Sequence, residues 1–151
     1  MEESIMEEGI NKLPEMIRET YGFKEQDPSE LSPLALAYIG DTVFDLIVRT
    51  KVVESAREPV RKLHKKATSI VNAKTQAAMV RESILPRLSE DEMKIFKRGR
   101  NAKSYTSSKN TGIIDYRTAT GLEALIGWLY LSGKMYRITE LVLPVIPGYE
   151  K

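Results

Sequence analysis

The chain has 151 residues, of which 42% are hydrophobic and 29% charged, with a formal net charge of +2, no cysteine and one histidine. This composition excludes disulfides, thiolate metal sites and a histidine-rich zinc site, so any metal must have oxygen ligands, which favours Mg²⁺ or Mn²⁺. There is no run of about 18 apolar residues and no basic, apolar leader, so we expect no membrane span and a cytoplasmic protein.

The first 30 residues are expected to form an acidic extension ahead of a single domain. They hold nine acidic and three basic residues. A short helix is predicted around residues 5–17, and Pro14 is expected to interrupt it. The domain then covers residues 31–147, and residues 148–151 are predicted to be a short tail.

Five main helices are predicted in this domain. Ser32-Pro33 is a typical helix start, because serine caps a helix N-terminus and proline suits the first turn. Ser89 is a second start, because three acidic residues follow it. We expect helices over residues 33–53, 59–83, 89–99, 117–131 and 135–145, with a basic loop over residues 100–116. No alternation typical of strands is found, so the predicted fold class is all-α.

Two of these helices carry an acidic residue in an apolar run close to a glycine. Asp41 follows Gly40, and Glu123 precedes Gly127 by four residues. Because glycine costs roughly 1 kcal/mol in a helix interior, we expect the two helices to cross tightly at these glycines. The crossing would bring Asp41 and Glu123 to one metal ion, although each acid could instead pair with a lysine or a helix N-terminus.

Positive charge is concentrated in two segments. Residues 57–74 have six Lys or Arg residues against one acid, and residues 94–117 have seven against one. A clustered basic surface is typical of proteins that bind a polyanion. The alternative is that each run is simply a solvated helix surface.

The segments around the two acids resemble the ribonuclease III family. Residues 39–45 are similar to the signature helix of that family, and residues 123–127 to its second catalytic segment. Within the family the resemblance is closest to the Mini-III subfamily, and it covers roughly residues 31–147. The matching Mini-III segments are residues 36–41, 63–66, 97–104 and 109–111.

This resemblance implies a helical catalytic domain without a double-stranded-RNA-binding domain, and a homodimer. It implies an endoribonuclease that cuts double-stranded RNA and leaves 5′-phosphate and 3′-hydroxyl ends. Asp41 and Glu123 match the metal ligands, and the expected cofactor is Mg²⁺, with Mn²⁺ as a substitute. The expected substrate is precursor large-subunit ribosomal RNA, and a ribosomal protein is a candidate partner.

The chain departs from ribonuclease III itself at three acidic positions, which are Leu34, Ala37 and Thr120 here. The Mini-III subfamily shares these departures. Water and RNA phosphate would then complete the metal coordination. We expect Asp45 to support the site by hydrogen bonding, with Tyr38 and Thr120 as further candidates for the same role.

Residues that suit contacts to RNA phosphates and 2′-hydroxyls lie in the basic segments. An alternative interpretation is a duplex-RNA-binding protein without catalysis, and another is a helical interaction module. The candidate RNA-binding residues are Lys65, Lys66, Arg98, Arg100, Asn101, Lys103, Ser104, Lys109 and Asn110.

Overall fold

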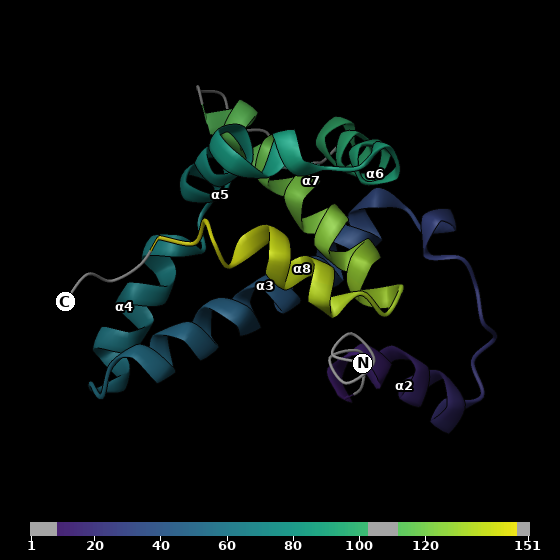
Figure 1. Cartoon of the computed structure of the whole chain (residues 1–151), viewed down its shortest axis with the longest axis horizontal. Coiled ribbons are helices and arrows are strands. Elements are labelled where there is room, and N and C mark those ends of the chain that lie inside the picture. The colour runs from purple at the N-terminus through teal and green to yellow at the C-terminus, as the bar shows by residue number, and fades with distance from the viewer. Residues whose placement is uncertain (1–8, 103–111, 148–151) are drawn as a thin grey trace.

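The computed structural model describes residues 9–102 and 112–147. All regular elements within these ranges are helices, as the sequence predicts, and Figure 1 shows their arrangement. Four short helical segments, η1 (Gly9–Lys12), η2 (Pro28–Glu30), η3 (Val80–Ile84) and η4 (Leu85–Arg87), lie between longer ones. The α-helices are α2 (Leu13–Tyr21), α3 (Pro33–Ser55), α4 (Val60–Ile70), α5 (Ala73–Met79), α6 (Glu90–Asn101), α7 (Gly112–Leu131) and α8 (Met135–Val142).

Helix α7 lies at the centre of the molecule. It packs against α3, α5, α6 and α8, and in Figure 1 it runs between α6 and α3. Its residues are buried almost without interruption from Thr118 to Tyr130. A helix that is apolar on all sides has to be covered on all sides, which explains this central place.

Helix α3 is the other long helix, and it is covered on one side only. Leu36, Phe44 and Val48 are fully buried against the core. Tyr38 and Val53, by contrast, are exposed apolar side chains. The side of α3 that carries Asp41 therefore faces solvent.

The predicted helix starts are confirmed in detail. The Ser32 hydroxyl accepts a hydrogen bond from the Ala35 amide at 3.1 Å, and Pro33 is in the first turn. Ser89 and Glu92 form a capping box, in which each side chain accepts from the backbone amide of the other residue. These caps satisfy amides that would otherwise lack a partner at the helix N-terminus.

The single helix predicted over residues 59–83 is wrong, because α4 ends at Ile70 and α5 starts at Ala73. Asn72 is responsible for the break. Its side-chain oxygen accepts from the Thr75 amide, while its side-chain nitrogen donates to the carbonyl of Thr68. One side chain thus closes one helix and caps the next.

Other boundaries differ from the prediction. Helix α7 begins at Gly112, so the expected loop over residues 100–116 is helical in its last five residues. Helix α8 ends at Val142, three residues earlier than predicted. Pro14 does not interrupt a helix, because it lies in the first turn of α2, where no helical amide bond is lost.

The described part of the N-terminal extension packs on the domain. The Asn11 side chain accepts from the Met135 amide at 2.7 Å. The Trp128 indole donates to the Ser29 hydroxyl at 2.9 Å, and the Arg98 guanidinium donates to the carbonyls of Ser29 and Leu31. In the described ranges, no helix has the length and apolar character to span a membrane.

Candidate metal site and RNA-binding surface

Helices α3 and α7 cross with their backbones in contact, as the two glycines predict. A Cβ atom added to Gly40 would lie 1.7 Å from the Glu123 carbonyl oxygen. A Cβ atom added to Gly127 would lie 1.9 Å from the Leu36 carbonyl oxygen. Only glycine permits this approach, and the approach places residue 41 of one helix beside residue 123 of the other.

The carboxyl groups of Asp41 and Glu123 lie together at this crossing. Burial raises the pKa of Glu123 to about 8, and hydrogen bonding with Asp41 and repulsion from its charge act in the same direction. The Gln76 side chain acts in the opposite direction and lowers that pKa. Two adjacent carboxyls without a cation hold a proton between them, which is why Glu123 stays protonated near neutral pH.

The pair fits an oxygen-ligated divalent cation. Asp41 is exposed, so a cation and its water ligands can reach the carboxyls from solvent. Among the described residues there is no group of three or more His, Cys, Asp or Glu side chains that could hold a metal. The protein therefore supplies few ligands, as the departures at Leu34, Ala37 and Thr120 lead us to expect.

The three residues expected to support the site have other surroundings. Asp45 forms an ion pair with Arg49 at 3.0 Å, one turn along α3. The Thr120 hydroxyl donates to the carbonyl of Tyr116 in its own helix at 2.9 Å. Tyr38 is 82% exposed. A supporting role for these three residues at the site remains a prediction.

Gln76 is a site residue that the sequence interpretation missed. It lies on α5, it is only 3% exposed, and its side chain is beside the Glu123 carboxyl. The signal in the sequence is a polar residue within the apolar stripe that includes Ala77 and Met79, both of which are buried. The prediction of one continuous helix over residues 59–83 gives no reason to place residue 76 beside Glu123.

Eight of the nine candidate RNA-binding residues fall into three groups. Lys65 on α4 and Asn101 at the end of α6 are exposed. Lys66 forms an ion pair with Glu58, and the Arg100 guanidinium lies over the Phe96 ring, 5.9 Å from its centroid. Lys103, Ser104, Lys109 and Asn110 lie outside the described residues.

The Arg98 side chain makes structural hydrogen bonds within the fold. Both of its donors to the backbone, at 2.9 Å to Ser29 and 3.0 Å to Leu31, tie η2 to α6. A guanidinium with these two partners has fewer donors left for phosphate. The geometry therefore favours a structural role for Arg98 over the RNA contact expected from its place in the basic segment.

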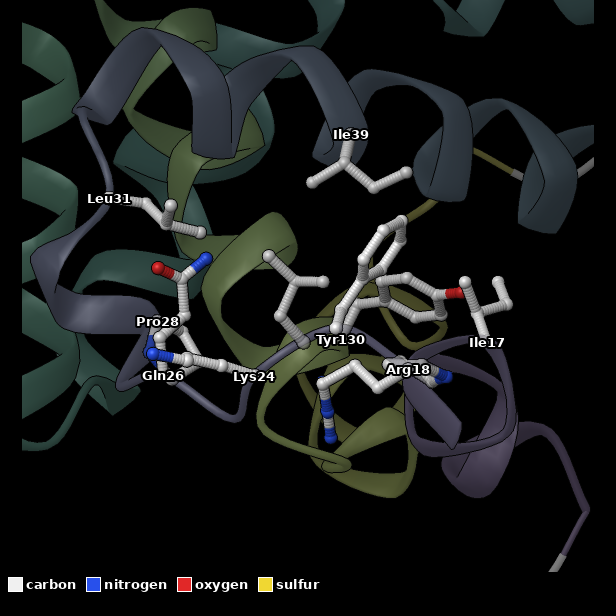
Figure 2. Close-up of a pocket in the computed structure, with 11 residues that line it drawn as sticks. Ile17, Arg18, Lys24, Gln26, Pro28, Leu31, Ile39 and Tyr130 are labelled. Carbon is white, nitrogen blue, oxygen red and sulfur yellow. The ribbon is translucent and has the colours of Figure 1, made fainter. Parts of the chain in front are cut away.

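A cavity of about 300 Å³ lies between the N-terminal segment and the ends of α3 and α7. Figure 2 shows Ile39 on one side of it, Arg18 on the opposite side, and Tyr130 between them. Neither acid of the candidate site lines it. Its lining combines apolar side chains with the cationic side chains of Arg18 and Lys24.

Comparison with known proteins gives a consistent result. The family described as "Ribonuclease III domain" matches residues 34–134. The chain is 47% identical over 130 residues to "Mini-ribonuclease 3" of Clostridium tetani, covering 85% of each chain. It is 48% identical over 117 residues to "Mini-ribonuclease 3" of Brevibacillus brevis, covering 78% of this chain and 87% of that one.

A solved structure supports the fold. The crystal structure of a Fusobacterium nucleatum protein superposes with a TM-score of 0.70 at 32% identity, covering 81% of this chain and 97% of that one. The resemblance predicted from residues 39–45 and 123–127 is confirmed by these matches. So is the expected all-α catalytic fold.

Proposed function

Because the chain belongs to the ribonuclease III family, and within it to the Mini-ribonuclease 3 group, it is an endoribonuclease, and we propose that it cuts double-stranded RNA at the Asp41–Glu123 pair with a divalent cation. The observation that carries the proposal is the meeting of the two carboxyls at a helix crossing that only glycine permits. The expected cation is Mg²⁺, with Mn²⁺ as a substitute.

Asp41 and Glu123 would hold the cation through their carboxylate oxygens. When bound, the cation supplies an activated water and charge stabilisation for in-line displacement at the phosphodiester. Glu123 has to lose its proton first, because its pKa of about 8 keeps it protonated at neutral pH. Asp41 is exposed and so lies on the side from which RNA would approach.

The chain's own exposed polar groups would hold the duplex. A-form RNA is recognised mainly through its phosphates and 2′-hydroxyls, which suits lysine and asparagine side chains. Lys65 and Asn101 are exposed on α4 and α6, which contact α3 and α7 respectively. A homodimer would place two such sites on one duplex, one for each strand.

The finer assignments also belong to the proposal. We expect 5′-phosphate and 3′-hydroxyl ends, precursor large-subunit ribosomal RNA as the substrate in the cytoplasm, and a ribosomal protein as a candidate partner. Their support is membership of the Mini-ribonuclease 3 group. Product ends can be read directly by ligation and by sequencing of the cleaved strands.

The test is cleavage of a perfect RNA duplex by purified protein with and without Mg²⁺. Asp41→Asn and Glu123→Gln should each lower the cleavage rate at least about 100-fold, since each removes one of the two carboxylates that would hold the cation. Asp91→Asn and Glu90→Gln are matched controls, because these exposed acids lie at the start of α6. Binding of the duplex without metal-dependent cleavage by the wild type would contradict the proposal.

A further inference from the structure

The Gln76 amide is unusual among the buried polar groups of the described residues. Its Nε2 atom is the one buried side-chain nitrogen or oxygen there that lacks a hydrogen-bond partner. The residue is 3% exposed, so bulk solvent does not reach this donor. A buried donor without a partner costs about 1–3 kcal/mol, and so its retention calls for a functional reason.

The place of Gln76 supplies that reason. Helix α5 packs along α7, and the Gln76 side chain lies close enough to the Glu123 carboxyl to lower its pKa, although Nε2 makes no full hydrogen bond there. In the metal-free protein Glu123 is engaged with Asp41 instead. A donor without a partner is therefore next to an acceptor that is occupied elsewhere.

We propose that Gln76 is a positioning residue of the metal site, whose Nε2 donates to the Glu123 carboxylate once the cation separates Glu123 from Asp41. This inference rests on the proposed metal site. One carboxylate oxygen would accept from Gln76, and the other would remain for the cation. Such outer partners fix the direction of a ligand, and a site with two carboxylates depends strongly on that direction.

The test is a titration of the full chain with Mn²⁺ in the absence of RNA. The concentration of free Mn²⁺ is measured from its electron paramagnetic resonance signal. Gln76→Met has nearly the same shape but no donor, and it should weaken Mn²⁺ binding about 10- to 100-fold. It should also raise the urea midpoint of the metal-free protein, because the donor without a partner is gone. Gln26→Met is the matched control, since Gln26 is exposed on the N-terminal segment.

The combination of results separates the proposal from simpler roles. If Gln76 had only a structural role, Gln76→Met would lower the urea midpoint and leave the Mn²⁺ affinity unchanged. That result would overturn the inference. Gln76→Glu tests direct ligation, because a carboxylate there would bind Mn²⁺ at least as tightly if the side-chain oxygen were itself a ligand. Tighter binding by Gln76→Glu would therefore also overturn the donor role.

The same titration distinguishes failure of the inference from failure of the proposed function. If Asp41→Asn abolishes Mn²⁺ binding while Gln76→Met binds like the wild type, the metal site stands and the role of Gln76 falls. If the wild type and Asp41→Asn bind Mn²⁺ equally, the metal site itself falls, and the role of Gln76 falls with it.

Discussion

Adding a single methyl group at Gly40 should strongly reduce both the stability of the fold and the cleavage of RNA. Replacing glycine by alanine in a helix interior normally stabilises it by about 1 kcal/mol. Here the added methyl group would lie 1.7 Å from the Glu123 carbonyl oxygen, and the helices would have to move apart. We expect Gly40→Ala to lower the free energy of unfolding in urea by about 3 kcal/mol and to impair cleavage.

The control is Ala35→Gly, at an exposed position of the same helix. It should lower the free energy of unfolding by only about 1 kcal/mol and leave cleavage intact. A Gly40→Ala protein as stable as the wild type would show that the crossing is looser than the structure indicates.

Glu123 makes the stability of the metal-free protein depend on pH. Its pKa is 4.5 in the unfolded chain and about 8 in the folded one, so between these values the folded state holds a proton that the unfolded state has lost. The free energy of unfolding should therefore fall as the pH rises from 4.5 to about 8. Urea unfolding at several pH values in a chelator measures this, and Glu123→Gln should flatten the slope.

Added Mg²⁺ gives the complementary result. A cation that binds only the folded state favours ionised Glu123, so it should restore stability most at the alkaline end of this range. A slope unchanged by Glu123→Gln would assign the pH dependence to other groups.

At residue scale, the acid pair was predictable and its surroundings were not. The glycines near Asp41 and Glu123 allow the backbones of α3 and α7 to approach closely. Glycine is recognisable in the sequence, so this approach could be predicted. The partners of Asp45 and Thr120 depend on rotamers, and both side chains find a partner within their own helix. Gln76 reaches the pair through the packing of α5 on α7, and its place in an apolar stripe indicates burial but not which carboxyl it lies beside.

At the scale of elements, an ion pair joins the start of α6 to α8. Arg137 donates to both carboxylate oxygens of Glu92, at 2.8 and 2.9 Å, and also to the carbonyl of Arg87. The hydrogen bonds from Arg137 hold the pKa of Glu92 below its usual range, although burial opposes them. Because Glu92 also closes the capping box, one carboxylate fixes both a helix start and a helix contact.

Glu92→Gln should therefore lower the free energy of unfolding by about 3 kcal/mol at neutral pH, since it removes the negative charge and one of the two acceptors that pair with Arg137. Thermal unfolding and urea titration measure this change. Glu140→Gln is the comparison, because Glu140 meets the same arginine at 3.3 Å from a more exposed position. Its effect should stay under about 0.5 kcal/mol, and equal effects would contradict the argument.

The elements themselves were largely predictable, and the failures share one cause. Helix starts at Ser32 and Ser89 follow from local capping chemistry, so the sequence shows them. The break at Asn72 uses the same chemistry, but the apolar spacing continues across it and conceals it. Helix α7 begins earlier than expected because residues 112–116, which include two isoleucines and a tyrosine, join a helix that the core stabilises.

At the scale of the whole molecule, charge is separated along its length. Figure 1 places α2 and α4 at opposite ends of the longest axis. The described residues 9–30, which include α2, hold five acidic and three basic residues, whereas residues 57–74, which include α4, hold one acidic and six Lys or Arg residues. RNA should therefore approach from the α4 end, because the summed electrostatic field of the basic residues there attracts its phosphates.

Lys65 on α4 provides the test of this polarity. Each phosphate contact releases counterions, so Lys65→Ala should weaken duplex RNA binding for all sequences and reduce the slope of log affinity against log salt by about 1. Lys24→Ala removes the same charge from an exposed site in the acidic N-terminal segment and should leave the slope unchanged. Titrations at several salt concentrations, with Mg²⁺ withheld to prevent cleavage, measure both slopes. Equal slopes for the two variants would place the RNA elsewhere, because a lysine in contact with phosphate cannot be removed without loss of counterion release.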